Sequence, residues 1–319
     1  FNDTVTTAIY TLSLHDALPI SLYRHDPVLQ ERLQSLVRQR INERKSDHAI
    51  IETGVVIRCC RSIINTHIGA YAQLQGVSTL ENGTILSCQE DPTRVGTDVV
   101  ARNFIMAEGA HVEDGVMLDK VFVGQATRLG KQFSAENTLL FCNCEGLHSE
   151  VCSLFAGPYT VTHHRSTLLI ASLTSFFNAG SGTNQSNHMY KLGPVHQGIL
   201  ERGTKTGSFS YALLECHLAP FTILIGKHLG SLDLADLPFS YITEDQGTSV
   251  LRPALNLFHI GTVRDAAKWR SRDRRQAGLK RDMIHFQTLS PYTVEKMRRG
   301  RDLLLRLYQE TPKEKDIVT

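Results

Sequence analysis

The sequence predicts an all-β solenoid, a parallel β-helix built from six-residue repeats. Aliphatic side chains stand at five of the six positions that recur every sixth residue from Val56 to Leu86. Smaller side chains follow four residues after each of the first five positions: Cys60, Thr66, Ala72, Ser78 and Thr84. The same period resumes after residue 100. A six-residue period with two phases is typical of solenoids that wind short strands into stacked coils.

Strand geometry explains why the two phases occur. Side chains alternate between the two faces of a strand, so residues two apart, such as Thr66 and Ile68, share a face. Each hexad therefore points one small and one larger side chain inward before the chain turns a corner. Stacked coils bury these columns against each other, and no coil is expected to be stable alone.

The regular hexads are expected over residues 56–134, within a β-helix that spans residues 51–260 and carries polar loops. Residues 87–98 contain Asp91-Pro92 and Gly96 and read as a loop that leaves the coil. The period then resumes at Val100 and slips by one residue at Val123. After residue 135 the hexads become irregular, and loops on a rigid scaffold are where binding sites are commonly built.

Helices are predicted at both ends of the solenoid. Residues 22–50 are interpreted as a helical N-terminal cap, because leucines recur at helical spacing after Asp26-Pro27. Residues 261–319 are interpreted as a charged, helical C-terminal segment, with a helix that starts at Ser290-Pro291. Solenoid ends need a polar cover, which these helices would provide.

The first 21 residues are expected to be an artefact. Residues 11–21 read as the translation of a common sequencing adapter, so residues 1–21 are excluded from the fold prediction. The chain starts with Phe1 rather than Met. We therefore expect a fragment of a longer protein, truncated at the C-terminal segment as well.

Composition restricts the class of protein. The 319 residues are 41% hydrophobic and 21% charged, as in an ordinary globular protein with a real core. A net charge of +2 argues against nucleic acid as a partner, and no apolar run is long enough for a membrane span. The seven cysteines include no zinc-type CxxC pair, which favours buried thiols in a reduced, cytoplasmic protein.

The densest polar stretch, residues 178–208, is a candidate ligand-binding site. Its glycines let the backbone approach a ligand, its amides suit sugar hydroxyls, and its cations suit phosphate. No P-loop pattern is present. The alternative is that its Asn and Ser side chains form ladders along solenoid corners. The candidate residues are Asn184, Asn187, Lys191, Arg202 and Lys205.

Histidines are the second functional signal. A neutral imidazole can act as a general base near physiological pH. The candidate catalytic residues are His163, His164, His188 and His196. The alternative for any one of them is a hydrogen-bonded structural histidine. Imidazoles in this number also permit a zinc site with a bound water, but no metal ligands and no cofactor are assigned from the sequence.

A basic stretch at residues 261–275 is the third signal. It contains Arg264, a candidate phosphate ligand, and Trp269, the one tryptophan of the chain. Guanidinium groups bind phosphates bidentately, and an indole can stack on a base or sugar. The alternative is a solvated helix in which Arg264 and Asp265 are charge neighbours.

Five motifs carry a resemblance to a known family: residues 156–164, 177–191, 193–198, 236–241 and 261–266. They resemble an uncharacterised bacterial family of long hexapeptide-repeat proteins, a domain of unknown function that is similar to hexapeptide transferases. The resemblance implies a left-handed parallel β-helix in which three hexads close one triangular coil. It also implies a cytoplasmic bacterial protein that forms a homo-oligomer, a trimer by analogy. The family has no established activity from which catalytic residues could be taken.

Three hypotheses for function follow. The first is a transferase that acts on a nucleotide-linked or phosphorylated sugar, with His188 or His196 as general base. The second is a non-enzymatic solenoid that serves as a binding or scaffold module. The third is a metal-dependent lyase or hydrolase similar to γ-class carbonic anhydrases, which ranks lower because their histidine spacing is not found here.

Overall fold

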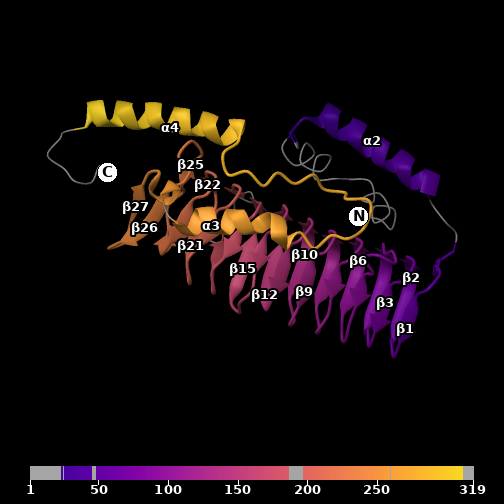
Figure 1. The fold of residues 1–319 in the computed structure, drawn as a ribbon. Coiled ribbons are helices and arrows are strands. Elements are labelled where there is room, and N and C mark those ends of the chain that lie inside the picture. The colour runs from indigo at the N-terminus through magenta and orange to yellow at the C-terminus, as the bar shows by residue number, and fades with distance from the viewer. Residues whose placement is uncertain (1–22, 24, 45–47, 187–196, 259, 312–319) are drawn as a thin grey trace.

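The computed structural model describes residues 23, 25–44, 48–186, 197–258 and 260–311. It is a parallel β-solenoid, so the predicted all-β solenoid is confirmed (Figure 1). The coils stack along one axis from residue 56 to residue 252, and helices lie against one side of the stack. No helix among the described residues has the length and apolarity that crossing a membrane requires.

One face of the solenoid is a sheet of single strands, one from each coil. Neighbours pair in parallel, except that the last two strands form an antiparallel hairpin. In the described residues its order is β1 (Val56–Arg58), β3 (Gln73–Gln75), β5 (Arg94–Val95), β7 (His111–Val112), β9 (Arg128–Gly130), β11 (Glu145–Leu147), β14 (Val161–Thr162), β17 (Asn178–Ala179), β20 (Lys205–Thr206), β23 (Ile223–Ile225), β26 (Tyr241–Asp245) and β27 (Thr248–Arg252).

The second sheet covers the other two faces. Its first five strands bend in the middle, and in later coils the strand is divided into two. The strands are β2 (Ser62–Ile68), β4 (Thr79–Ile85), β6 (Val100–Met106), β8 (Met117–Val123), β10 (Ser134–Leu140), β12 (Ser149–Cys152), β13 (Phe155–Ala156), β15 (Thr167–Ile170), β16 (Ser172–Thr174), β18 (Asn184–Ser186), β19 (Gly198–Leu200), β21 (Tyr211–Leu213), β22 (Cys216–Leu218), β24 (Lys227–His228) and β25 (Asp233–Leu234).

Asparagines make the bend in this sheet. Asn65, Asn82 and Asn103 have φ values of 45°, 52° and 52°, in the left-handed region that asparagine tolerates better than most residues. The Asn65 Nδ2 donates to Asn82 Oδ1 one coil further on, at 2.9 Å. These side chains therefore form a corner ladder, which turns the chain between two faces of the solenoid.

Most coils of the regular region contain 17 residues rather than the 18 that three full hexads require. Strand partners in successive coils are Ser62 and Thr79, Val100 and Met117, and Met117 and Ser134. Each 17-residue coil therefore shifts the six-residue phase by one residue. This explains why the period is displaced by one residue at Val123. Phe122 belongs to a cluster outside the central core, with Ile105 and Phe141.

The central core is a column of aliphatic side chains through the stacked coils. Leu74, Leu80 and Ile85 are fully buried in it, as are Val112 and Val123 further along the solenoid. Hydrophobic burial of this kind stabilises a coil only when its neighbours are present. The predicted inward direction is thus confirmed in the middle of the six-residue series that runs from Val56 to Leu86. Val56 itself, in the first coil, is exposed.

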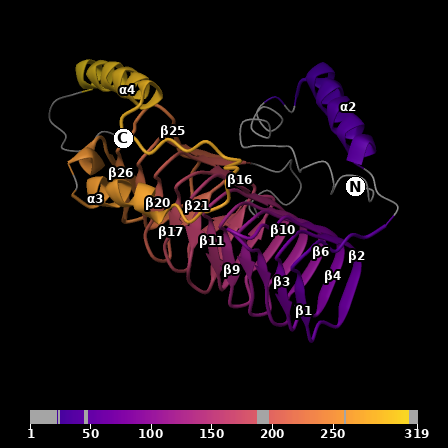
Figure 2. The same ribbon diagram turned by 45° about the vertical axis from the view of Figure 1, so that its right-hand side comes forward.

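The helices lie outside the coils. They are α2 (Pro27–Arg44), the short turns η3 (Leu255–Leu257) and η4 (Arg270–Arg272), α3 (Ile260–Trp269) and α4 (Pro291–Glu310). Between η4 and α4, residues 273–290 run back along the solenoid and then return. Figures 1 and 2 show this irregular segment as a thin orange ribbon beside the coils. We name residues 273–290 the return segment. The domain boundaries expected from the sequence, including a capping role for α2, stay predictions.

Candidate functional site

The return segment docks on a column of polar side chains that stand at one corner of successive coils. Asp91 accepts hydrogen bonds from the backbone N–H groups of Gln276 and Ala277, at 2.8 and 3.2 Å. Glu108 is the next residue of this column, and Asn143 lies two coils beyond it. The Asn143 Oδ1 accepts a hydrogen bond from the backbone N–H of Arg274 at 3.0 Å. The column therefore satisfies backbone groups of an irregular segment, which would otherwise be buried without partners.

Arg202, a predicted phosphate ligand, lies inside this docking contact. Its guanidinium stands over the rings of Phe176 and Trp269, 4.2 and 5.4 Å from their centroids. It donates to the backbone oxygen of His285, and burial lowers its pKa to about 10. Trp269 itself is 8% exposed and packs near Phe221 rather than standing free for a ligand. In this conformation Arg202 holds the return segment.

Lys205 and Arg264 meet at the same carboxylate. Lys205 Nζ forms an ion pair with Asp265 of α3, and Arg264 Nε lies 3.4 Å from the other oxygen of Asp265. Burial disfavours the charged form of Asp265, but its hydrogen bond with Lys205 outweighs this effect and lowers the pKa. Arg264 is largely exposed. The structure thus brings these two predicted residues together, in a contact that fixes α3 on the solenoid.

The histidine pair 163–164 is divided between two environments. His163 Nε2 lies 2.5 Å from Glu145 Oε2, and Arg274 of the return segment pairs with the other oxygen of Glu145. The hydrogen bond from His163 and the charge of Arg274 hold the pKa of Glu145 below its usual range. His164 is exposed at the next position. His163 is therefore held in an ion-pair network with the return segment.

The remaining candidates fall mostly outside the described residues. Asn187, His188, Lys191 and His196 lie in residues 187–196, so their roles stay predictions. Asn184 is described, in β18, and its Oδ1 is buried without a hydrogen-bond partner among the described residues. Within the described ranges, no three His, Cys, Asp or Glu side chains converge in a way that would hold a metal ion.

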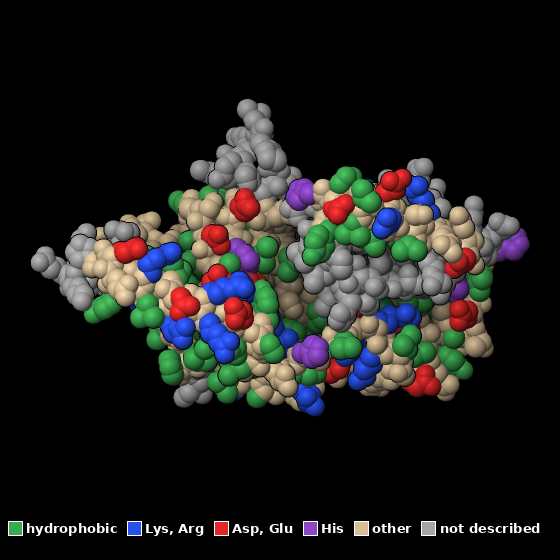
Figure 3. Space-filling model, turned by 90° about the horizontal axis from the view of Figure 1, so that it is seen from above, with side chains coloured by type: hydrophobic (Ala, Val, Ile, Leu, Met, Phe, Trp, Pro, Cys, Tyr) green, Lys and Arg blue, Asp and Glu red, His purple; other side chains and the backbone are tan. Residues whose placement is uncertain are grey.

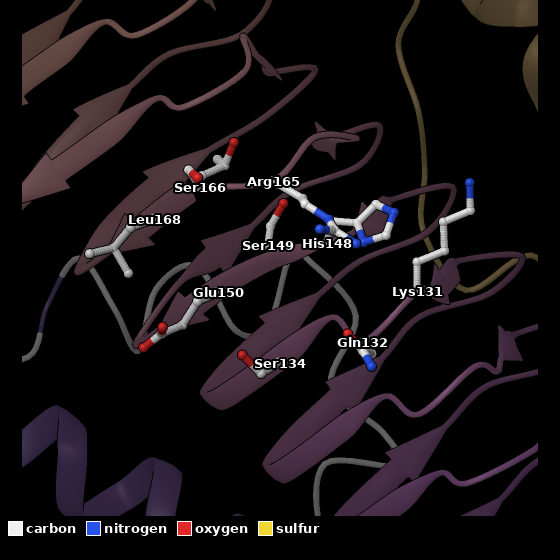
Figure 4. A pocket seen from close by; sticks show the side chains of 10 residues that line it. Lys131, Gln132, Ser134, His148, Ser149, Glu150, Arg165, Ser166 and Leu168 are labelled. Carbon is white, nitrogen blue, oxygen red and sulfur yellow. The ribbon is translucent and has the colours of Figure 1, made fainter.

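A cavity of about 510 Å³ lies at a different corner, and our sequence analysis did not identify it. Lys131, His148 and Arg165 line it from three successive coils, each 17 residues after the last. Lys131 and His148 both stand at corner positions with φ of 52° and 54°. Figure 4 shows the three side chains projecting from neighbouring coils at the edge of the second sheet. The 17-residue spacing of these three residues indicates a shared site only when the coil length is known.

The electrostatics of this cavity favour an anion at its basic edge. Within the described part of the chain, Lys131, His148 and Arg165 have no ion-pair partner. Its lining also includes Glu150 and the buried Thr167. Thr167 is 2% exposed, and its Oγ1 has no hydrogen-bond partner among the described residues. This oxygen has no access to solvent, so it lies beneath the wall of the cavity and out of reach of a ligand there.

The surface over the helices carries charges of both signs. In the view of Figure 3, lysine and arginine side chains alternate with aspartate and glutamate across the face that α4 occupies. Among the described residues seen in this view, basic side chains do not merge into a continuous surface. The corner cavity differs from this face, because its basic residues Lys131, His148 and Arg165 stand above one another on successive coils.

Fold and cavity together define a solenoid protein of the hexapeptide-repeat type, with a polar corner cavity and a docked C-terminal segment. The chain belongs to the family described as Domain of unknown function (DUF4954), whose model matches residues 5–308. It is 28% identical over 304 residues to an uncharacterized protein of Treponema pallidum (strain Nichols), which covers 91% of this chain. The chain spans 40% of the length of that relative.

Two solved structures are similar at low identity. One is an Arabidopsis UDP-N-acetylglucosamine acyltransferase, with 13% identity, a TM-score of 0.29, and coverage of 84% of this chain and 99% of that one. The other is a UDP-N-acetylglucosamine acyltransferase of Francisella novicida, with 9% identity, a TM-score of 0.27, and coverage of 82% and 87%.

Proposed function

We propose that this chain binds a phosphorylated or nucleotide-linked sugar in the corner cavity and acts as a transferase of the hexapeptide type. One observation carries the proposal: Lys131, His148 and Arg165 converge on one cavity, with no ion-pair partner among the described residues. Cations in this arrangement are suited to phosphate, because ammonium and guanidinium groups both form charge-assisted hydrogen bonds with its oxygens.

The rest of the lining supports a sugar beside the phosphate. Ser134 and Glu150 offer a hydroxyl and a carboxylate, which can donate to or accept from sugar hydroxyls. His148 supplies an imidazole at the same place, which is suited to take a proton from an acceptor hydroxyl or amine. The bases predicted from the sequence, His188 and His196, lie outside the described residues and stay candidates.

Isothermal titration with glucose 1-phosphate and with UDP-N-acetylglucosamine tests the binding step. Lys131→Gln and Arg165→Gln should each weaken binding at least tenfold, as expected when a charge-assisted hydrogen bond of about 1.5–3 kcal/mol is lost. Lys120→Gln is the matched control, because Lys120 has the same left-handed backbone, with φ 54°, and does not line the cavity. Equal losses in Lys120→Gln and Lys131→Gln would remove the cavity from the proposal.

The catalytic step needs a separate readout. Thiol release from acetyl-CoA in the presence of a sugar phosphate reports acyl transfer, and His148→Asn should reduce turnover while the affinity for the sugar phosphate changes less than threefold. The same substitution at His188 and His196 tests the two bases predicted from the sequence. Unchanged turnover in all three variants would exclude a histidine base at these positions.

A non-enzymatic scaffold is the second candidate function, and one observation favours it. Arg202 and Lys205, both predicted to hold phosphate, are engaged in fixing the return segment and α3. A ligand that binds the folded state raises its thermal stability. A scaffold should therefore show no thermal shift with acyl-CoA, sugar phosphate or sugar nucleotide, whereas the transferase should be stabilised by at least one of them.

A further inference from the structure

A second cavity, of about 340 Å³, lies next to the corner cavity on the outer face of the second sheet. The two share Ser134 and Glu150, which line both. These residues are strand partners in neighbouring coils, on β10 and β12. Since neighbouring strands are about 4.8 Å apart, the shared wall is narrow and one ligand can extend from the first cavity into the second.

The second cavity has the opposite charge character. Asp119, Glu136 and Glu150 line it, and the one basic residue of its described lining, Arg102, faces Glu81 of the preceding coil at 3.5 Å. Asp119 and Glu136 accept hydrogen bonds from the neutral amides of Asn103 and Asn137. Neither carboxylate forms an ion pair with a described cation, although Arg102 is the strand partner of Asp119.

Basic and acidic groups thus lie at opposite ends of two adjoining cavities, which we name the groove. Lys131 and Glu136 are five residues apart on the same coil, so the two ends are separated by at most about 17 Å at roughly 3.3 Å per residue. Glu150 lies between them, on the wall common to both cavities.

We infer that the groove takes a ligand with a phosphate at one end and a primary amine at the other. This inference rests on the proposed function and names its substrate class. The phosphate lies at Lys131 and Arg165, and the ammonium lies between Glu150, Glu136 and Asp119. A hydroxyl in place of the ammonium leaves the carboxylates without a positive partner, and an acetamide places an uncharged, bulkier group there.

Titration calorimetry at pH 6.5 with three sugar phosphates tests this inference. Glucosamine 6-phosphate should bind at least tenfold more tightly than glucose 6-phosphate or N-acetylglucosamine 6-phosphate, which differ from it at one substituent. Glu136→Gln combined with Asp119→Asn should reduce this preference to less than threefold and leave the affinity for glucose 6-phosphate unchanged. Glu113→Gln, at an exposed glutamate that does not line either cavity, is the matched control.

The outcomes separate this inference from the proposed function. If none of the three sugar phosphates binds, the inference is wrong, whereas the proposed function still stands if glucose 1-phosphate or UDP-N-acetylglucosamine binds in a way that depends on Lys131. If glucose 6-phosphate and glucosamine 6-phosphate bind equally well and binding depends on Lys131, the phosphate site stands and the amine end is wrong. A preference for glucosamine 6-phosphate that survives in the Glu136→Gln, Asp119→Asn protein also overturns the placement of the amine.

Discussion

Arg281 and Glu108 are 173 residues apart in the sequence, yet Arg281 Nη2 donates to Glu108 Oε1 at 2.6 Å and its Nε donates to Glu108 Oε2 at 3.1 Å. Gln125, one coil further on, donates to the same carboxylate at 3.0 Å. Burial disfavours ionisation of Glu108, but the hydrogen bond and charge of Arg281 outweigh it, so its pKa is lowered. This bidentate pair anchors the turning point of the return segment.

Arg281→Gln should loosen the return segment. The substitution removes a bidentate, partly buried ion pair, and we expect a loss of about 1–3 kcal/mol in the free energy of unfolding. Urea unfolding followed by the fluorescence of Trp269 measures it, because Trp269 packs beside the return segment. Arg298→Gln, at an exposed arginine of α4, should change the free energy by less than about 0.5 kcal/mol. Equal effects of the two substitutions would show that the pair does not anchor the segment.

Glu201→Gln should destabilise the protein more strongly. Its side chain accepts from His217 at 2.6 Å, from Lys296 at 2.9 Å and from Tyr292 at 2.8 Å. Lys296 is nearly buried, so loss of the carboxylate leaves an uncompensated charge, and we expect a cost of about 3–5 kcal/mol. Thermal and urea unfolding measure the cost. The double variant with Lys296→Met should recover part of it, and no recovery would contradict this account.

Acid should destabilise the fold through three glutamates. Glu108, Glu145 and Glu201 all have pKa values lowered in the folded state. Their contribution is therefore fully present above the unfolded pKa of about 4.3 and is lost as the pH falls through the lower folded values. The part of the free energy of unfolding that these three glutamates contribute should be constant between pH 7 and pH 5 and then decrease below about pH 4.3. A Glu145→Gln protein should show a shallower decrease, and an identical slope would exclude Glu145 as a contributor.

Cysteine reactivity should follow burial. Burial raises the pKa of the Cys144 and Cys216 thiols to about 12, and it raises that of Cys142 as well. Cys59 is exposed. Because the thiolate is the reactive species, iodoacetamide at pH 8 should label Cys59 first and leave the three buried thiols unmodified. Peptide mass spectrometry reads the labelled positions, and all seven cysteines should react in urea. Labelling of Cys142 in the native protein would contradict its described burial.

Gly83→Ala should distort the core. A Cβ at Gly83 would meet the Phe104 ring at 2.1 Å, and Phe104 is fully buried in the next coil. Overpacking of this kind costs about 1–3 kcal/mol. Gly230→Ala is the control, because a Cβ there meets nothing within 4 Å. Differential scanning calorimetry compares the two melting temperatures, and a Gly83→Ala protein as stable as the control would show that the ring can move aside freely.

The fold was predictable from the sequence because its determinants are local. Leu74 and Leu80 are buried as the six-residue phase predicts, since inward direction along a strand depends only on nearby residues. The phase could not give the coil length, because strand partners such as Ser62 and Thr79 are 17 residues apart rather than the 18 of three full hexads. This is also why the corner cavity was missed: Lys131 and His148 align only on a 17-residue coil.

The docking of the C-terminal segment could not be predicted in the same way. Trp269 and Phe176 are in contact, with ring centroids 4.4 Å apart, but nothing near either residue in the sequence indicates the other. Lys205 and Asp265 likewise meet across 60 positions. Charged residues in a polar stretch predict a ligand as readily as they predict an internal partner, so the pairing had to come from the structure.

The out-and-back path of residues 273–290 has a consequence for how the protein matures. A ribosome completes every coil before it synthesises the segment that covers their corner, and neighbouring coils can associate as they emerge. Asp91 and Glu108 therefore remain in water until residues 276–281 have been synthesised. We expect closure of this corner to follow the stacking of the coils, so that a nascent chain halted before residue 273 presents stacked coils whose corner is still open to water and to other proteins.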